Sequence, residues 1–264
     1  MARLTPTSSH ENPFRGSWLV RSIWLLAAGY LIYSINAMDL KWSRIQDGMG
    51  HAGTMLDRMF PPNFSRWELL LSGLAESLEI AIIASIVGII LSLFLGLFSA
   101  RNFMPNWVSI PMRGFIALCR TFHPVIIAIL FVKSVGFGPL AGILTLIVAS
   151  IGFIAKLFAE AIEEISLKQV EAIRATGAGF ASIILFSVMP QVFARFIGFS
   201  TYQLDSNLRN STMIGIVGAG GLGGTLFSAF QRFDYDFVSA ILITIIALIM
   251  FGEFLSNIVR RIFR

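Results

Sequence analysis

Four apolar stretches of 16 to 22 residues, each without a charged side chain, constrain the fold more than any other feature of the sequence. They cover residues 22–38, 80–100, 134–155 and 237–252, and the last stays apolar past Glu253 to Val259. A membrane-spanning helix needs about 20 mostly apolar residues, so each stretch is a candidate span. The composition agrees, because 56% of the residues are hydrophobic and 13% are charged, against roughly 25% charged in a soluble domain. The sequence therefore predicts an all-α, polytopic membrane protein.

Two further regions are expected to cross the membrane less regularly. Residues 113–133 carry Arg120, His123 and Pro124 inside an apolar background. The chain must cross the membrane here, because without this crossing the loops that follow would lie on the opposite side of the membrane. In residues 190–231, the polar cluster 205–210 separates an apolar piece from a glycine-rich one. Non-helical backbone at membrane depth occurs only where protein or a water-filled cavity satisfies it. This pattern predicts one broken or re-entrant crossing, and about six spans in total.

The positions of lysine and arginine predict the topology. Arginines lie near both ends of the sequence. Cytoplasmic segments of membrane proteins carry an excess of lysine and arginine. We therefore expect a cytoplasmic tail over residues 1–17, a first transmembrane helix over 18–38 and a periplasmic loop over 39–68. The remaining residues, 69–264, would form the core, with both termini in the cytoplasm.

Several other functions are excluded or disfavoured. The formal charge of +5 is not concentrated in a basic stripe outside the apolar runs, so no nucleic-acid partner is expected. One cysteine and three scattered histidines predict no disulfide and no metal site. The N-terminus lacks the pattern of a cleaved signal peptide. No Walker pattern and no set of catalytic residues occurs, so we expect no enzymatic activity from this chain alone.

Residues 163–189 form the most informative segment outside the predicted spans. A helix is expected over 162–176, broken by Gly177 and Gly179, and a second helix is expected over 180–188, ending at Pro190. Two short helices at an angle would project from the bilayer and could lie in a groove of a soluble partner. The alternative is an amphipathic hairpin on the membrane surface with no partner.

This segment resembles the EAA motif of bacterial ABC-importer permeases: Glu-Ala-Ala, three residues, Gly, nine residues, Ile, one residue, Leu-Pro. Glu171, Ala172, Gly177 and Pro190 match in register, whereas positions 173, 187 and 189 carry Ile, Ser and Met. In that family the loop docks into a cytoplasmic ATPase subunit. The resemblance implies that these four residues, together with Arg174, couple the chain to the ATPase. Residues 163–189 are called the EAA segment below.

Three other blocks resemble the phosphonate/phosphite branch of these permeases: residues 120–124, 136–142 and 207–223. The resemblance implies a type I importer permease fold in the bacterial inner membrane, and an importer for phosphonate, phosphite or a related small phosphorus oxyanion. It implies a dimer of this chain, two cytoplasmic ATPase subunits and a periplasmic substrate-binding protein. ATP would bind to the partners, so no cofactor is expected in this subunit. A permease for another small solute and a secondary transporter are the alternatives.

Several polar or glycine residues in the predicted spans are candidates for the translocation pathway. They are Arg120, His123, Asn207, Arg209 and Gly220. A charge at membrane depth usually faces a cavity or a partner, so Arg120 would serve an anion or pair with Glu76, Glu79 or Asp205. Residues 218–223 also match G-x-G-x-x-G, but the βαβ unit of a dinucleotide site is missing. Close helix packing and a flexible gate are the two interpretations kept for these glycines.

Overall fold

The computed structural model describes residues 18–38 and 42–262, and every regular element in these residues is helical. The chain divides into two compact units, residues 1–57 and 58–264. The elements are α1 (Trp18–Ala37), α2 (Trp42–Met59), α3 (Trp67–Ser99), α4 (Asn106–Thr121), α5 (Pro124–Val135), α6 (Pro139–Ser150), α7 (Lys156–Glu163), α8 (Leu167–Ala175), α9 (Phe180–Ile183), α10 (Met189–Gly215), α11 (Leu222–Gln231) and α12 (Tyr235–Ile262). Two π-helical turns, η1 (Ile151–Ala155) and η2 (Ile184–Val188), join α6 to α7 and α9 to α10 without a break.

The first unit holds α1 and nearly all of α2. Helix α1 covers the predicted first span and buries none of its residues. Helix α2 occupies residues 42–59 of the predicted periplasmic loop 39–68. The predicted tail 1–17 lies outside the described residues, as do residues 39–41.

Helices long and apolar enough to span a membrane dominate the described residues. Five qualify alone, and the bent pair of α4 and α5 would make a sixth. This confirms the prediction of about six spans. The two helices of the pair meet at 92°, at the residues His123 and Pro124. A proline disfavours helical backbone in the residue before it, so the bend falls where the sequence places that proline.

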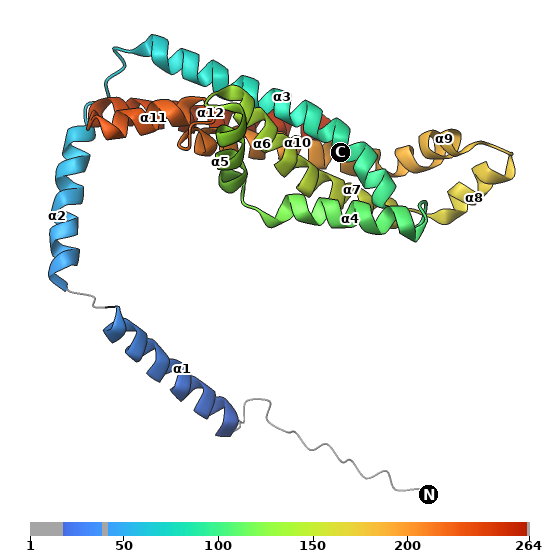
Figure 1. The fold of residues 1–264 in the computed structure, drawn as a ribbon, viewed down its shortest axis with the longest axis horizontal. Helices are drawn as coiled ribbons and strands as arrows, with labels where there is room; N and C mark the ends of the chain where they lie inside the picture. The colour runs from blue at the N-terminus through green and yellow to red at the C-terminus, as the bar shows by residue number, and fades with distance from the viewer. Residues whose placement is uncertain (1–17, 39–41, 263–264) are drawn as a thin grey trace, which may run out of the picture. The chain divides into compact units, whose positions relative to one another are not determined.

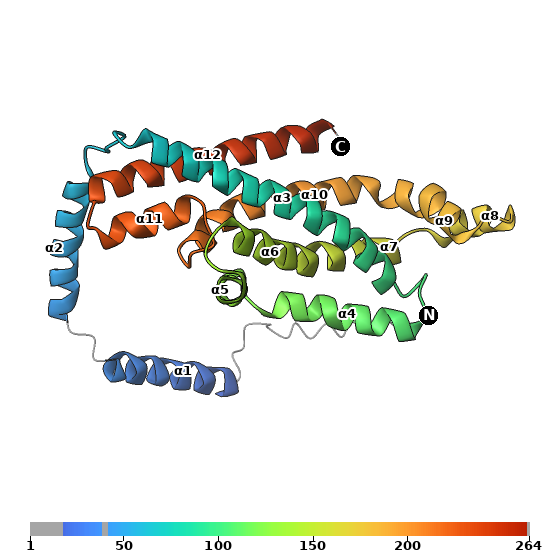
Figure 2. The ribbon, with the colours of Figure 1, turned by 45° about the horizontal axis from the view of Figure 1, so that its top comes forward.

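The second unit is a bundle in which α3, α6, α10 and α12 run along its long axis (Figures 1 and 2). The buried face of α3 consists largely of glycine, alanine and serine, while most of its large apolar residues are exposed, among them Ile82, Ile83, Ile86, Ile90, Phe94 and Phe98. A Cβ on Gly88 would lie 2.6 Å from Ser150 Cβ, and one on Gly96 would lie 2.8 Å from Phe158 Cδ1. Small residues at the interface let helix backbones approach closely, and lipid accommodates the large apolar residues on the outside.

The glycine-rich stretch after α10 is a tight turn. Gly218, Gly220 and Gly221 have φ values of 91°, 84° and 76°, which residues with a side chain rarely adopt. A Cβ on Gly221 would lie 2.5 Å from Ser77 Oγ, and this hydroxyl accepts a hydrogen bond from the backbone nitrogen of Leu222 at 2.8 Å. The glycines therefore serve a turn that packs closely on α3.

Three expected helix boundaries are wrong. The cluster 205–210 does not interrupt the crossing, because α10 continues through it to Gly215, and the break comes at the glycine turn. The helix expected over 162–176 is interrupted at residues 164–166, between α7 and α8. The helix expected to end at Pro190 continues through it. In the last case the π-helical turn η2 comes directly before the proline at the start of α10, and such turns occur as bulges within continuous helices.

Candidate functional site

The EAA segment projects from one end of the second unit, beyond the long helices (Figure 1). Its tip is the turn 176–179 between α8 and α9, where Gly177 has a φ of 77°. Nothing lies within 4 Å of a Cβ built on Gly177, so the glycine serves the left-handed backbone and not a close contact. Val170 is the buried residue of α8 and Ile183 that of α9. The predicted bend between two short helices is therefore confirmed.

The five residues predicted to contact an ATPase lie at the surface of this segment. Glu171, Ala172, Arg174, Gly177 and Pro190 are all exposed. Glu171 and Arg174 make no ion pair within the part of the chain that the structure describes. The segment thus presents both charges and its turn to solvent.

Polar contacts fix the first residues of the EAA segment, 163–166, to the bundle. Glu163 Oε1 accepts a hydrogen bond from the backbone nitrogen of Arg101 at 2.7 Å and pairs with the Arg113 guanidinium. Arg195 of α10 pairs with Glu164 at 2.6 Å. Gln191 Oε1 accepts a hydrogen bond from the backbone nitrogen of Ser166 at 2.9 Å. The turn between α7 and α8 is therefore held by α4 on one side and by α10 on the other.

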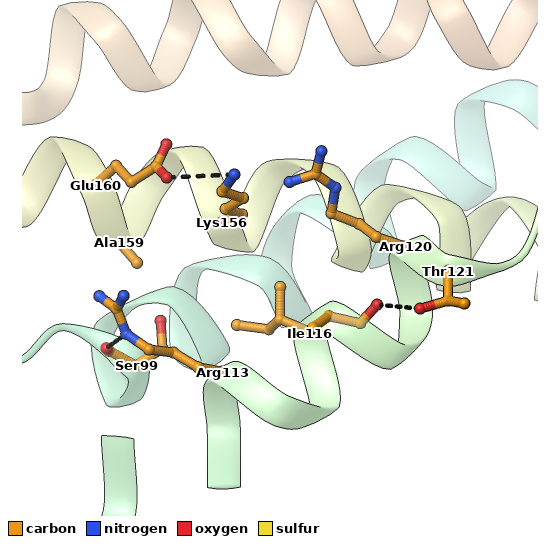
Figure 3. Close-up of a pocket in the computed structure, with 9 residues that line it drawn as sticks. Ser99, Arg113, Ile116, Arg120, Thr121, Lys156, Ala159 and Glu160 are labelled. Atoms are coloured by element: carbon orange, nitrogen blue, oxygen red, sulfur yellow. Dashed lines mark hydrogen bonds and ion pairs between the residues drawn. The ribbon is translucent and has the colours of Figure 1, made fainter. Parts of the chain in front are cut away.

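A pocket of about 430 Å³ lies between α4 and the η1–α7 region, and it is called the α4–α7 pocket below (Figure 3). Its walls are Ser99, Arg113, Ile116, Ala117, Arg120, Thr121, Lys156, Ala159 and Glu160. Lys156 pairs with Glu160 at 3.5 Å, one helical turn away. Arg113 Nε donates to the carbonyl oxygen of Ser99 at 2.9 Å. The pocket thus brings three cations and one carboxylate together.

Arg120 is the cation of this pocket that has no carboxylate partner. None of Glu76, Glu79 and Asp205 pairs with it in residues 42–262, so the ion-pair alternative of the sequence analysis is not realised. Its side chain extends from the end of α4 toward α7 (Figure 3). A Cβ on Gly152 would lie 2.9 Å from Arg120 Cγ and 3.0 Å from its backbone nitrogen. Glycine at position 152 therefore lets the last turn of α4 lie against η1.

His123 belongs to the bend that follows α4 and does not line the pocket. It is the N-cap of α5, and its Nδ1 accepts a hydrogen bond from the backbone nitrogen of Val125 at 3.3 Å. This contact satisfies one of the free N–H groups at the start of a helix. The role that the structure shows for His123 is to start α5.

Asn207 lies in a buried polar cluster between α3, α6 and α10, called the Asn207 network below. Its Nδ2 donates to Ser85 Oγ at 2.9 Å and to Ser150 Oγ at 3.0 Å, and its Oδ1 accepts from Gln203 at 2.9 Å. Gln203 also donates to Ser150 Oγ at 3.1 Å. Asn207 and Ser150 are completely buried. Both amide protons of Asn207 are thus used in helix packing.

The other two pathway candidates lie apart from the α4–α7 pocket. Arg209 pairs with Asp205 at 3.1 Å, one turn earlier on α10. Gly220 belongs to the glycine turn, where its Cβ would lie 2.7 Å from Glu76 Oε1. The structure therefore does not bring the five candidates together.

Sequence reasoning missed three charged residues of the pocket: Arg113, Lys156 and Glu160. Lys156 and Glu160 lie just beyond the uncharged stretch that ends at residue 155. Their spacing of four residues on a helix was the available signal, because such residues share a face. The proximity of Arg113 and Arg120 to that face depends on how α4 folds back, which the sequence does not reveal.

Comparisons with known proteins agree with this architecture. The profile of the family "Binding-protein-dependent transport system inner membrane component" matches residues 88–264. The phosphate-import permease protein PhnE of Mycolicibacterium smegmatis is 39% identical over 238 residues, which are 88% of this chain and 43% of that protein. The phosphite transport system permease protein PtxC of Stutzerimonas stutzeri is 32% identical over 247 residues, which are 93% of this chain and 88% of that protein. The chain thus spans less than half of the mycobacterial relative and most of the other.

Solved structures share the fold. An inward-facing conformation of the MetNI methionine ABC transporter has a chain that superposes with a TM-score of 0.67 at 23% identity, covering 76% of this chain and 99% of its own. A chain of an amino acid ABC transporter with histidines gives a TM-score of 0.61 at 18% identity, covering 74% of this chain and 94% of its own. At these identities the likeness concerns the fold, and it shows the predicted type I architecture.

Proposed function

Because the chain belongs to the family of inner-membrane components of binding-protein-dependent transport systems, we propose that it is the membrane-spanning permease subunit of an ATP-driven importer. The observation that carries this proposal is the EAA segment, an exposed pair of helices around a glycine turn at one end of a membrane bundle. Such a projection fits a groove on a soluble partner. The chain would hydrolyse no ATP itself, and nucleotide would bind to its partners.

The substrate that we propose is a phosphonate, phosphite or related small phosphorus oxyanion. Relatives over most of the chain are phosphate-import and phosphite-transport permeases by name. The free cation Arg120 in the α4–α7 pocket supports an anion as cargo. A permease for another small solute remains the second candidate, and names of more distant relatives such as the methionine permease of Bacillus subtilis favour it.

The complex that we propose holds two copies of this chain, two cytoplasmic ATPase subunits and a periplasmic binding protein in the bacterial inner membrane. Charged side chains at membrane depth face protein or a water-filled cavity, and Arg120 and Lys156 are exposed on a single chain. A second copy would shield them from lipid. Helix α12 runs back toward the end that carries the EAA segment (Figure 2), which supports a cytoplasmic C-terminus.

Replacement of Gly177 tests the coupling role. Gly177→Leu forces a side chain onto left-handed backbone, which costs about 1–2 kcal/mol for a residue with a Cβ, and it enlarges the tip of the EAA segment. We expect the variant to insert normally, to copurify poorly with the ATPase subunit and to lose at least roughly tenfold in uptake, which corresponds to about 1.4 kcal/mol of docking free energy. Uptake of radiolabelled phosphite and methylphosphonate is measured in vesicles that contain the reconstituted complex.

The matched control is Gly179→Ala. Position 179 has an ordinary φ of −70° and open space around its Cβ, so this variant should behave as wild type. Full assembly and wild-type uptake by Gly177→Leu would contradict the coupling role. Uptake that persists without ATPase subunits would instead identify a secondary transporter.

A further inference from the structure

The charges of the α4–α7 pocket do not balance. Arg113, Arg120 and Lys156 supply three positive charges and Glu160 supplies one negative charge among the residues that line it. Glu163 lies just outside and pairs with Arg113. Even with both carboxylates counted, one positive charge is uncompensated. In a chain whose neighbouring helices span the membrane, such a charge is costly unless an anion or water reaches it.

The imbalance falls on Arg120, which has the geometry of an anion ligand. Lys156 and Arg113 each have an internal carboxylate, whereas Arg120 has none within the described residues. A guanidinium presents a planar fork of donors that matches two oxygens of a phosphate-like group. The hydroxyl of Thr121 donates to the carbonyl oxygen of Ala117 at 2.9 Å, so its proton is already used within α4. Gly152 and η1 set the direction of the Arg120 stem.

We propose that the α4–α7 pocket is a binding site for a tetrahedral phosphorus oxyanion, held by Arg120 and Lys156. This inference rests on the proposed function for its ligand class and adds the residues that hold the ligand. The cavity has a volume of about 430 Å³. One molecule in liquid water occupies about 30 Å³, so the cavity is more than ten times larger. It therefore admits a small oxyanion that keeps part of its hydration shell, such as phosphite, phosphate or methylphosphonate.

Glu160 is the internal competitor of this anion. Its carboxylate lies 3.5 Å from Lys156 Nζ and both side chains are half exposed, so the pair is weak and opens readily. An arriving anion takes the place of the Glu160 carboxylate on Lys156. When the anion leaves, Glu160 returns and neutralises the lysine. Such an exchange keeps affinity low, as a transport pathway requires, because a tightly held substrate would not be released.

Direct binding to the full chain tests the site independently of any partner. The purified chain in a maltoside detergent, which contains no phosphorus, is titrated into phosphite, phosphate and methylphosphonate. The ³¹P line widths report bound anion. Arg120→Gln and Lys156→Gln should each weaken binding roughly tenfold, as expected for one charge-assisted hydrogen bond. Glu160→Gln should strengthen it severalfold.

Two features keep this test decisive. Lys133→Gln is the matched control, because Lys133 is an exposed cation at the end of α5, outside the pocket, and it should bind as wild type. Glu160→Gln predicts a gain, which a misfolded variant cannot mimic. The proposal is overturned if wild type shows no broadening, if Arg120→Gln binds as wild type, or if Glu160→Gln binds no better.

A lipid phosphate offers the same chemistry as free phosphate, so a second arm separates the two. Phosphatidylglycerol that copurifies with the chain is quantified for wild type and Arg120→Gln. Lipid lost in the variant, without broadening of any free anion by wild type, would make this a lipid site and overturn the proposal. Anion binding by the chain without uptake by the assembled complex would refute the importer function but leave the site. Normal uptake together with unchanged anion binding by Arg120→Gln would refute the site but leave the importer function.

Discussion

The Asn207 network and the α4–α7 pocket are two polar regions within one apolar bundle, and they differ in whether their hydrogen bonds are complete. In the network, the Asn207 amide is completely buried and both of its protons and its oxygen have partners. In the pocket, Arg120 points toward open volume and has no carboxylate in the described residues. A closed set of hydrogen bonds holds helices together, whereas an open charge is available to a ligand. We infer that the network serves stability and that the pocket serves the proposed transport.

The largest effect is expected for Arg120→Gln, which tests the open side of this contrast. Uptake should fall roughly 10- to 100-fold, as for loss of one or two charge-assisted hydrogen bonds to an anion. Thermal stability should be unchanged or higher, because an unpaired arginine at membrane depth costs about 2.5–3.5 kcal/mol on insertion scales. Vesicle uptake and thermal unfolding in detergent are measured on the same preparation. A lower melting temperature with normal uptake would give Arg120 a structural role.

Asn207→Leu tests the closed side. The substitution leaves Gln203, Ser85 and Ser150 without a shared partner, and interhelical hydrogen bonds in membranes are worth about 1–2 kcal/mol in model peptides. We expect a loss of stability of about that size, with uptake per folded molecule retained. Unfolding is followed by titration with a denaturing detergent. Loss of uptake with unchanged stability would instead place Asn207 on the pathway, as the sequence predicts.

Gly152→Ala tests whether the position of Arg120 matters and not only its charge. The added methyl group meets Arg120 Cγ and the backbone of α4, so the last turn of α4 must shift. We expect uptake to fall severalfold, with a loss of stability of about 1–3 kcal/mol from overpacking. Gly198→Ala is the control, because a Cβ there has open space. Equal effects of both substitutions on uptake would remove the positioning role.

The smallest effect is expected for Ser109→Ala. Ser109 is completely buried, and its hydroxyl has no hydrogen-bond partner in the described part of the chain. Removing an unpaired buried hydroxyl should leave stability unchanged or raise it by less than about 1 kcal/mol. Ser150→Ala removes the same atom from the Asn207 network and should destabilise the protein. If both alanine variants unfold alike, the distinction between closed and open polar groups fails.

The parts of the fold that the sequence predicts are those decided by local chemistry. Uncharged stretches predict α1, α3 and α12 because length and composition alone decide whether a helix suits a membrane. The turn around Gly177 follows from glycines between two helical segments, and the bend before Pro124 follows from the backbone preference of the preceding residue. None of these requires knowledge of a distant contact.

The errors arise where distant residues decide the local structure. The polar cluster 205–210 suggests a break, yet Asn207 is satisfied by Ser85 and Ser150, which lie 122 and 57 positions away. Pro190 is accommodated because a π-helical turn precedes it, which no sequence pattern specifies. Of the residues that line the α4–α7 pocket, only Arg120 is a candidate from the sequence alone. Arg120 is a candidate because it is a charged residue within a predicted span. Lys156 and Glu160 lie in the same pocket only because α4 folds against α7.

Glu163 connects the α4–α7 pocket to the EAA segment. The free energy of its ion pair with Arg113 therefore depends on the positions of both. One oxygen of its carboxylate holds both the Arg113 side chain, which lines the pocket, and the backbone of Arg101. Glu163 is also the last residue of α7, before the turn into the EAA segment. The electrostatic potential in the pocket therefore depends on where that turn lies. Thermodynamic linkage makes the dependence reciprocal, so any movement of the turn that raises anion affinity is favoured by a bound anion to the same extent.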